Sequence, residues 1–363
     1  MPSKEVDKNL IVATTINKPD IKFYDARREP FDVYGLYNYK NEEKFKRLPD
    51  EIGMNTNEGV ADLYCRTAGG RIRFKTNSQY VAIKAEWDIK KHYPHCALSG
   101  STGFDLYIDA PRDRLSKFYK SFVPPVDCEN GYESVVEFDS AKERYITINF
   151  PTYNEVKNLY IGLQENASLE EGKKYHYDLP VVFYGSSITQ GGCASRPGNA
   201  YQAILSRKFD FDFINLGFSG SARGEDLIVN YMAGLDMLMF VSDYDHNASV
   251  PVLRDTHFKM YQKIREKHPD IPYIMVSKAD TTPFNHYGYD DMVNRRIIIQ
   301  DSYRRAWESG DRNVYLIDGD LVYHGDYADG ATVDGTHPTD LGFAFMAESY
   351  VKMIEEIIIN GKI

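Results

Sequence analysis

The 363-residue sequence has only four cysteines, and their spacing is not that of a metal-binding motif. Cys65, Cys96, Cys128 and Cys193 are sparse for so long a chain, which indicates free thiols rather than a disulfide framework. Free thiols are typical of a reducing compartment, so we expect a cytoplasmic protein. The alternative is an exported protein whose leader is missing from this sequence.

The sequence also lacks long apolar runs and clusters of basic residues. The longest apolar run near the N-terminus, Leu10–Ala13, is too short for the apolar region of a signal peptide or for a membrane-spanning helix. Acidic residues outnumber basic ones by 53 to 43, which gives a net charge of −10. An acidic chain repels phosphate backbones, so neither nucleic acid nor a membrane is an expected partner.

The first part of the chain has the pattern of short β-strands separated by turns. Strand-type runs lie at Ile21–Tyr24, Arg71–Lys75, Tyr80–Trp87, Phe104–Ile108, Glu133–Phe138, Tyr145–Phe150 and Asn158–Gly162. Because no clear helical period interrupts them, residues 21–165 are predicted to form an antiparallel, jelly-roll-like β-sandwich. Residues 1–20 are interpreted as a tail or edge segment, and the polar residues 166–178 as a linker.

From residue 179 to 363, short apolar runs alternate with helical patterns. Strands are predicted at Val181–Tyr184, Phe211–Asn215, Met237–Ser242, Tyr273–Ser277 and Val314–Asp318. Helices are predicted at Asn199–Lys208, Glu225–Met232, Val250–Lys267, Asp290–Glu308 and Pro338–Ile358. Five strands that alternate with helices predict an α/β domain with a parallel sheet covered on both faces.

Residues with useful chemistry follow the ends of these strands, where open α/β sheets bind their ligands. Ser187 follows the first strand in a Gly-Ser-Ser turn, and Asn215–Gly220 overlaps the end of the second. Asn247 follows the third strand, and Asp334–His337 follows the fifth. We therefore expect four separate loops to converge on one point.

This set of residues predicts serine-dependent acyl transfer. A serine hydroxyl is a weak nucleophile until an imidazole takes its proton, which makes Ser187 the candidate nucleophile and His337 the candidate base. Asp334 would fix the tautomer of the imidazole and stabilise the imidazolium. The candidate oxyanion donors are the backbone N–H groups of Ser187 and Gly220 and the side-chain amide of Asn247. No cofactor and no metal is predicted.

These segments resemble the sequence blocks of the SGNH, or GDSL-type, hydrolases. Gly185–Ser187 is similar to the first block, Asn215–Gly220 to the second, Asn247 to the third and Asp334–His337 to the fifth. Upstream, Gly103–Tyr107 resembles the signature of the GxDLY domain, a β-domain that precedes the hydrolase domain in one branch of the family. The resemblance implies a flavodoxin-like, three-layer αβα hydrolase domain and a carboxylic ester hydrolase similar to carbohydrate esterases.

The chain departs from the family pattern at two places. Ser186 stands where the common motif has Asp, and Asp245 stands where the third block has Gly, so Asp245 could adopt a left-handed backbone. His246 could contact substrate or face solvent, and the solvent interpretation is favoured. The alternative α/β-hydrolase fold is disfavoured, because its nucleophile elbow needs Gly where this chain has Thr189.

The resemblance to carbohydrate esterases implies the substrate class: short-chain acyl esters, and an O-acetylated carbohydrate in particular. His92 and His95 lie in a loop that we expect to lean over the catalytic cleft and contact substrate. The spacing of His92, His95 and Cys96 would also suit zinc, but the sequence shows no second ligand pair. Arg196, shortly after the nucleophile, could bind an acidic substrate group or pair with a surface carboxylate.

Two alternatives to hydrolysis stay open at this point. An acyltransferase would use the same acyl-enzyme with an alcohol in place of water. A catalytically inert glycan-binding protein would keep the fold without turnover, although the intact catalytic residue types argue against it. A homo-oligomer is compatible with the sequence, which does not fix the oligomeric state.

Overall fold

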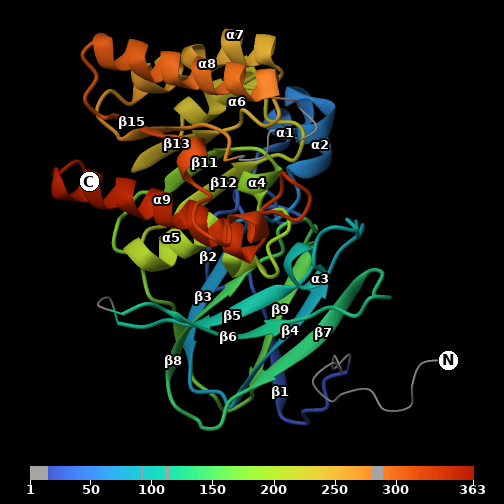
Figure 1. Ribbon diagram of the computed structural model, residues 1–363. Coiled ribbons are helices and arrows are strands. Elements are labelled where there is room, and N and C mark those ends of the chain that lie inside the picture. The colour runs from blue at the N-terminus through green and yellow to red at the C-terminus, as the bar shows by residue number, and fades with distance from the viewer. Residues whose placement is uncertain (1–14, 92, 112–113, 280–288) are drawn as a thin grey trace.

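Figure 1 shows the computed structural model of the chain, which describes residues 15–91, 93–111, 114–279 and 289–363. A β-rich part lies against a part in which helices cover a central sheet. Residues 1–14 of the predicted tail and the candidate His92 lie outside the described residues. No helix in the described part of the chain combines the length and the apolar character needed to span a bilayer.

The β-rich part is a sandwich of two antiparallel sheets. The first has the order β1-β9-β4-β7: Ile21–Asp25, Asn158–Gln164, Tyr80–Glu86 and Gly131–Glu137. The second has the order β10-β3-β8-β5-β6: Leu169–Glu171, Arg71–Thr76, Arg144–Asn149, Phe104–Ile108 and Lys117–Phe122; β2 (Asp32–Tyr34) also pairs with β3. Ile72 and Phe104 of one sheet and Ile83 and Ile161 of the other share a fully buried core. The predicted antiparallel sandwich is confirmed.

Three strands of the sandwich were not predicted, for two physical reasons. β2 and β10 have three residues each, too few to show an alternating pattern. β6 is an edge strand whose first four residues are exposed, so it lacks buried alternate positions. β10 pairs with β3, with Leu169 opposite Thr76, and so corrects part of the predicted linker 166–178 to a strand.

The helices α1 (Asp50–Thr56) and α2 (Glu58–Leu63) are also unexpected in a region predicted to be all β. Each is too short to show a helical period, and Asn57 caps α2 by accepting from the backbone N–H of Val60 at 2.9 Å. Val60 and Leu63 pack into the core of the α/β part, beside which both helices lie in Figure 1. The chain thus crosses between the two parts more than once, and the domain boundaries near residues 165 and 179 stay a prediction.

The α/β part has the predicted three layers. Its parallel sheet has the order β12-β11-β13-β14-β15: Phe213–Gly217, Val181–Gly185, Met239–Asp243, Tyr273–Val276 and Val314–Ile317. This is the flavodoxin-like order 2-1-3-4-5. α5 (Tyr201–Phe209) and α9 (Asp340–Ile359) cover one face; α6 (Asp226–Ala233), α7 (Val250–Lys267) and α8 (Tyr289–Glu308) cover the other. The described residues also form short helical turns: α3 (Leu98–Ser101), α4 (Ser187–Gln190), and the 3-10 turns Pro197–Asn199, Gly319–Leu321 and Ala328–Ala331.

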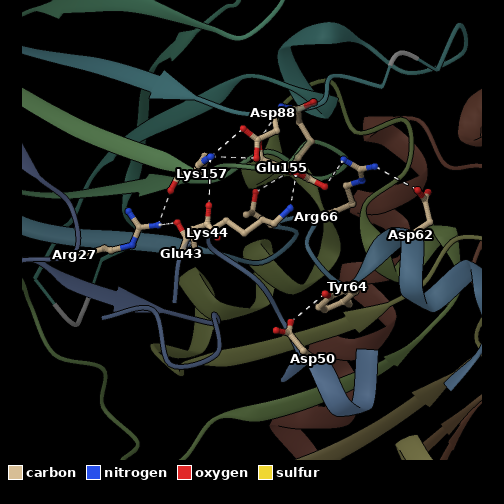
Figure 2. Close-up of polar contacts among 12 residues, drawn as sticks. Arg27, Glu43, Lys44, Asp50, Asp62, Tyr64, Arg66, Asp88, Glu155 and Lys157 are labelled. Carbon is tan, nitrogen blue, oxygen red and sulfur yellow. Dashed lines mark hydrogen bonds and ion pairs between the residues drawn. The ribbon is translucent and has the colours of Figure 1, made fainter. Parts of the chain in front are cut away.

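A polar network ties the segment around α1 and α2 to the sandwich (Figure 2). The carboxylate of Glu155 receives Lys44 at 3.2 Å and Arg66 at 3.3 Å. Arg66 also faces Asp62 of α2 at 3.6 Å. Because the Arg66 and Glu155 side chains are only 1% and 8% exposed, water screens this pair less than a surface ion pair. The network joins residues that the sequence separates widely.

Arg47 joins the same segment to the α/β sheet. Its guanidinium is buried and donates to the carbonyl oxygens of Leu63 (2.8 Å), Arg66 (2.7 Å), Asn215 (3.1 Å) and Gly217 (2.5 Å). Asn215 and Gly217 lie on β12, directly before the loop that carries Gly220. Arg47 therefore fixes the end of the strand from which a candidate site loop departs.

Replacing Arg47 with Met should destabilise the protein strongly, because four buried carbonyl groups lose their donor. We expect the free energy of unfolding to fall by about 3 kcal/mol or more. The matched control is Arg28→Met, since the Arg28 side chain is 79% exposed and a surface change costs roughly 0.5 kcal/mol or less. Denaturant unfolding of both variants measures the difference; equal stabilities would contradict the role given to Arg47.

Candidate active site

The turn after β11 places Ser187 at the carboxyl edge of the parallel sheet. Ser186 caps α4, because its hydroxyl oxygen accepts from the backbone N–H of Ile188 at 3.2 Å. Ser187 is consequently the first residue of this one-turn helix, which ends at Gly191 with a φ of +98°. Serine at position 186 thus keeps the capping oxygen that an aspartate would supply.

Three side chains from two distant segments form one hydrogen-bonded line. Ser187 Oγ lies 2.9 Å from His337 Nε2, and His337 Nδ1 lies 2.8 Å from Asp334 Oδ2. The other carboxylate oxygen of Asp334 accepts from the backbone N–H groups of Thr336 (3.0 Å) and His337 (2.8 Å). The Nδ1–H group of the neutral imidazole donates a hydrogen bond to Asp334. The lone pair of Nε2 therefore faces the serine hydroxyl.

The charge of Asp334 suits this arrangement. Burial raises the pKa of Asp334, but hydrogen bonds from the backbone and side chain of His337 outweigh burial and hold the pKa below its ordinary value. The carboxylate therefore stays ionised at neutral pH and can stabilise a positive charge that develops on the imidazole.

Gly220 and Asn247, the predicted partners of Ser187 in oxyanion binding, lie on adjacent loops that are bonded to each other. Gly220 has a φ of +70°, a conformation that favours glycine, and nothing lies within 4 Å of where a Cβ would be. The side-chain oxygen of Asn247 accepts from the backbone N–H of Ala222 at 3.3 Å, and the NH₂ group is the donor half of the same amide. The roles of these donors stay a prediction.

Buried charges hold the turn that carries Asn247. Asp245 accepts from the backbone N–H of Lys278 at 2.8 Å, and Arg295 donates to the carbonyl oxygens of Asp245 and Ala248. The expectation of a left-handed Asp245 is wrong: in the described chain, the non-glycine residues with positive φ are Asn38, Cys193 and Asp210. Side-chain bonding, rather than an unusual backbone, replaces the glycine of the family pattern.

His246 lies under the site rather than in solvent. Its exposed fraction is 4%, so the favoured interpretation of a solvent-facing side chain is wrong. Burial, followed by the nearby charge of Lys278, lowers the pKa of His246 well below its ordinary value. Its contact with substrate stays a prediction, and the imidazole that would make it is neutral.

The β-sandwich contributes directly to the surroundings of Ser187. The hydroxyl group of Tyr153 donates a hydrogen bond to the carbonyl oxygen of Ser187 at 3.1 Å. The ring of His95, which is exposed, lies 5.2 Å from that of His337 between centroids. The loop before α3 therefore reaches the edge of the site, as a cleft-shaping loop must.

Arg196, predicted as a possible substrate ligand, bonds to residues of the β-sandwich. Its guanidinium lies 3.2 Å from Asp105 and also donates to the hydroxyl of Tyr107, while its centre is 3.8 Å from the ring centroid of Phe118. Asp105 is fully buried, so the partner is not a surface carboxylate. The contact of Arg196 with substrate stays a prediction.

Comparison with known proteins places the chain in a family. The model of the GDSL-like lipase/acylhydrolase family matches residues 178–355, and that of the GxDLY domain, the N-terminus of SGNH-hydrolase-type esterases, matches residues 21–169. A Bacteroides ovatus protein described as a GDSL-like lipase is 30% identical; the match covers 93% of this chain and 98% of that one, with a TM-score of 0.84. The chain belongs to the GDSL-like lipase/acylhydrolase family. It is a carboxylic ester hydrolase.

Several solved structures share the fold of this GDSL-like hydrolase at lower identity. A salicylyl-acyltransferase from a tetracycline biosynthetic pathway is 18% identical, with a TM-score of 0.76 over 94% of this chain and 98% of that one. A family two carbohydrate esterase from Clostridium thermocellum, solved with cellohexaose, is 13% identical, with a TM-score of 0.61 over 92% of this chain and 100% of that one. A search of curated proteins found no match.

Sequence reasoning missed two residues that hold the site of this GDSL-like hydrolase together. Tyr153 carries no motif and precedes the hydrolase domain, so only the fold reveals its bond to Ser187. Gln190 joins three segments: its amide donates to the carbonyl oxygen of Thr152 at 3.2 Å and accepts from the backbone N–H of Ser219 at 3.0 Å. Its position directly after the nucleophile block was the only available signal.

Asp243, at the end of β13, is a buried carboxyl group beneath the site. It accepts from the hydroxyl groups of Tyr201 at 3.1 Å and Thr189 at 3.3 Å. Burial and then the neighbouring charge of Asp245 raise the pKa of Asp243 to about 8 from an ordinary 3.8. Between these two pH values the folded protein keeps a proton that the unfolded chain releases, so stability falls as the pH rises.

Asp243→Asn should remove this pH dependence, because the amide is neutral and has nearly the shape of the protonated carboxyl group. We expect the variant to gain stability over the wild type as the pH rises from about 4 to about 8. Thermal unfolding across that range measures the difference in stability between the variant and the wild type. Asp326→Asn, at an exposed carboxylate, is the control. If the stability advantage of Asp243→Asn shrinks or reverses toward high pH, the raised pKa of Asp243 is contradicted.

Proposed function

We propose that this GDSL-like hydrolase cleaves short-chain acyl esters through a covalent acyl-enzyme on Ser187. The observation that carries the proposal is the line of hydrogen bonds from Ser187 through His337 to Asp334, at 2.9 and 2.8 Å. Such a line lets the imidazole remove the hydroxyl proton as the oxygen attacks. Family membership supports the reaction class, and the geometry supports the assignment of residues.

The proposed reaction has two halves. In the first, His337 takes the proton of Ser187, the serine oxygen attacks the ester carbonyl, and the tetrahedral intermediate expels the alcohol with that proton. The N–H groups of Ser187 and Gly220 and the amide of Asn247 would stabilise the negative oxygen, each donor being worth roughly 3 kcal/mol. In the second half, His337 takes a proton from water as the water oxygen attacks the acyl carbonyl. The bond to Ser187 Oγ then breaks, His337 returns the proton to that oxygen, and the acid leaves.

We propose an O-acetylated carbohydrate as the substrate class. Fold similarity to carbohydrate esterases, one of them solved with cellohexaose, supports this choice. The exposure of Gly220 and His95 also suits a bulky alcohol, because a saccharide must reach the acyl group from an open side. His95, beside the catalytic imidazole, is the described loop residue best placed to contact the sugar.

Hydrolysis of p-nitrophenyl acetate should depend on the serine and the imidazole. We expect Ser187→Ala and His337→Ala each to lower kcat by about three orders of magnitude or more, because either change removes proton-coupled attack. Asp334→Ala should cost less, since Nε2 can still face Ser187. Ser349→Ala on α9 is the matched control and should keep wild-type kcat. Equal rates for wild type and Ser187→Ala would refute the proposal.

An acyltransferase is the second candidate, and the observation that favours it is the fold similarity to a salicylyl-acyltransferase over 94% of the chain. The two candidates differ only in what attacks the acyl-enzyme: water or a second alcohol. They share Ser187, His337 and Asp334, so loss of activity in the variants above does not separate them.

Product analysis separates hydrolysis from transfer. With an acetylated oligosaccharide as donor and an unacetylated one as acceptor, we expect free acetate to equal the ester consumed, whatever the acceptor concentration. Acylated acceptor that forms at the expense of free acetate would instead establish the transferase. Tight binding of the saccharide without loss of its ester would indicate an inert glycan-binding protein and contradict both enzymatic candidates.

A further inference from the structure

Two buried cysteines from distant parts of the chain meet beside the catalytic residues. Cys96 precedes α3 of the sandwich, and Cys193 follows α4, the turn that begins with Ser187. Their sulfur atoms lie 3.7 Å apart, and the two residues are 5% and 8% exposed. Cys65 and Cys128, which are also buried free thiols, lie elsewhere in the chain.

The loops that carry these thiols pack tightly. Gly100 lies so close to the loop of Cys193 that a Cβ would be 1.9 Å from the carbonyl oxygen of Ala194, and Ser99 donates to the carbonyl oxygen of Ser195 at 2.6 Å. Cys193 has a φ of +70°, a costly conformation for a residue with a side chain. The fold therefore holds the two sulfur atoms in place rather than letting them meet by chance motion.

His95 supplies a third possible metal ligand beside the two sulfur atoms. One ligand atom each from His95, Cys96 and Cys193 lies within 4.8 Å of the others. The thiols are buried while His95 is exposed, so the imidazole can rotate toward the sulfur atoms without disturbing a core. The sequence predicted no metal because it showed no second ligand pair; folding brings Cys193 close to His95 and Cys96.

The spacing and the chemistry of these donors select one class of ligand. Two thiolates bound to a tetrahedral zinc ion at about 2.3 Å each lie roughly 3.8 Å apart, close to the sulfur separation observed. Two sulfur atoms and an imidazole prefer soft or borderline ions such as Zn²⁺ over Mg²⁺ or Ca²⁺, which require oxygen ligands. Three protein ligands also leave a fourth position for water.

We propose that His95, Cys96 and Cys193 form a binding site for a thiophilic divalent cation, of which Zn²⁺ is the best fit. Bound there, the ion would tie the sandwich loop to the nucleophile loop. It would also place positive charge near His337, whose ring lies 5.2 Å from that of His95, and so slow proton removal from Ser187. Binding itself requires no ester hydrolysis, so the site goes beyond the proposed function.

Titration with Co²⁺, a coloured substitute for Zn²⁺, tests the site on the full-length protein reduced with a phosphine. We expect one Co²⁺ per chain, a thiolate-to-cobalt charge-transfer band, and displacement by Zn²⁺ but not by Mg²⁺. Cys96→Ser and Cys193→Ser should each weaken binding by more than the roughly 10- to 100-fold that loss of an outer partner costs. His95→Gln should weaken binding but keep the band of two thiolates, and as an exposed change it should fold normally.

Cys65→Ser and Cys128→Ser are the matched controls, because they remove buried free thiols elsewhere and should leave binding unchanged. Absence of the band in wild-type protein with four titratable thiols would overturn the proposal. The proposal would also be overturned if the charge-transfer band persisted in the Cys96→Ser variant and in the Cys193→Ser variant. Loss of the band in a control variant would overturn it as well. Zn²⁺ should also slow p-nitrophenyl acetate hydrolysis by the wild type and not by Cys193→Ser; this last readout alone depends on the proposed function.

Discussion

The buried carboxylate of Asp105 is the interaction on which the arrangement of the two parts depends. It accepts from Asn149 of its own sandwich at 2.7 Å, and from the backbone N–H of Gly198 (2.9 Å) and the guanidinium of Arg196 (3.2 Å) in the loop after Ser187. A buried carboxylate is costly unless such donors surround it. The aspartate of the GxDLY signature therefore anchors the catalytic domain to the sandwich.

This anchor explains why residues of the sandwich contact the candidate site. Once the loop after Ser187 is fixed, Tyr153 reaches the carbonyl oxygen of Ser187 and His95 reaches the edge of His337. Ser187 is then held from both sides, by the parallel sheet and by the sandwich. Gly220, by contrast, is exposed.

The sequence predicted those features that depend on local pattern. Alternating strands and helices locate the parallel sheet, and the rule that ligands bind at the carboxyl ends of strands brings Ser187, Asn247 and His337 to one edge. The surroundings of the candidate residues depend on long-range packing and could not be predicted. Arg196 pairs with Asp105 across the interface, and His246 is buried, although both look like exposed loop residues in the sequence.

Covalent trapping tests the central claim most directly. The claim is that the hydroxyl of Ser187, activated by His337, is the nucleophile. After reaction with a p-nitrophenyl phosphonate, peptide mass spectrometry should find one adduct per chain, on Ser187, and His337→Ala should form it far more slowly. An adduct on another residue such as Cys193, or ester hydrolysis that continues while Ser187 is fully modified, would contradict the account.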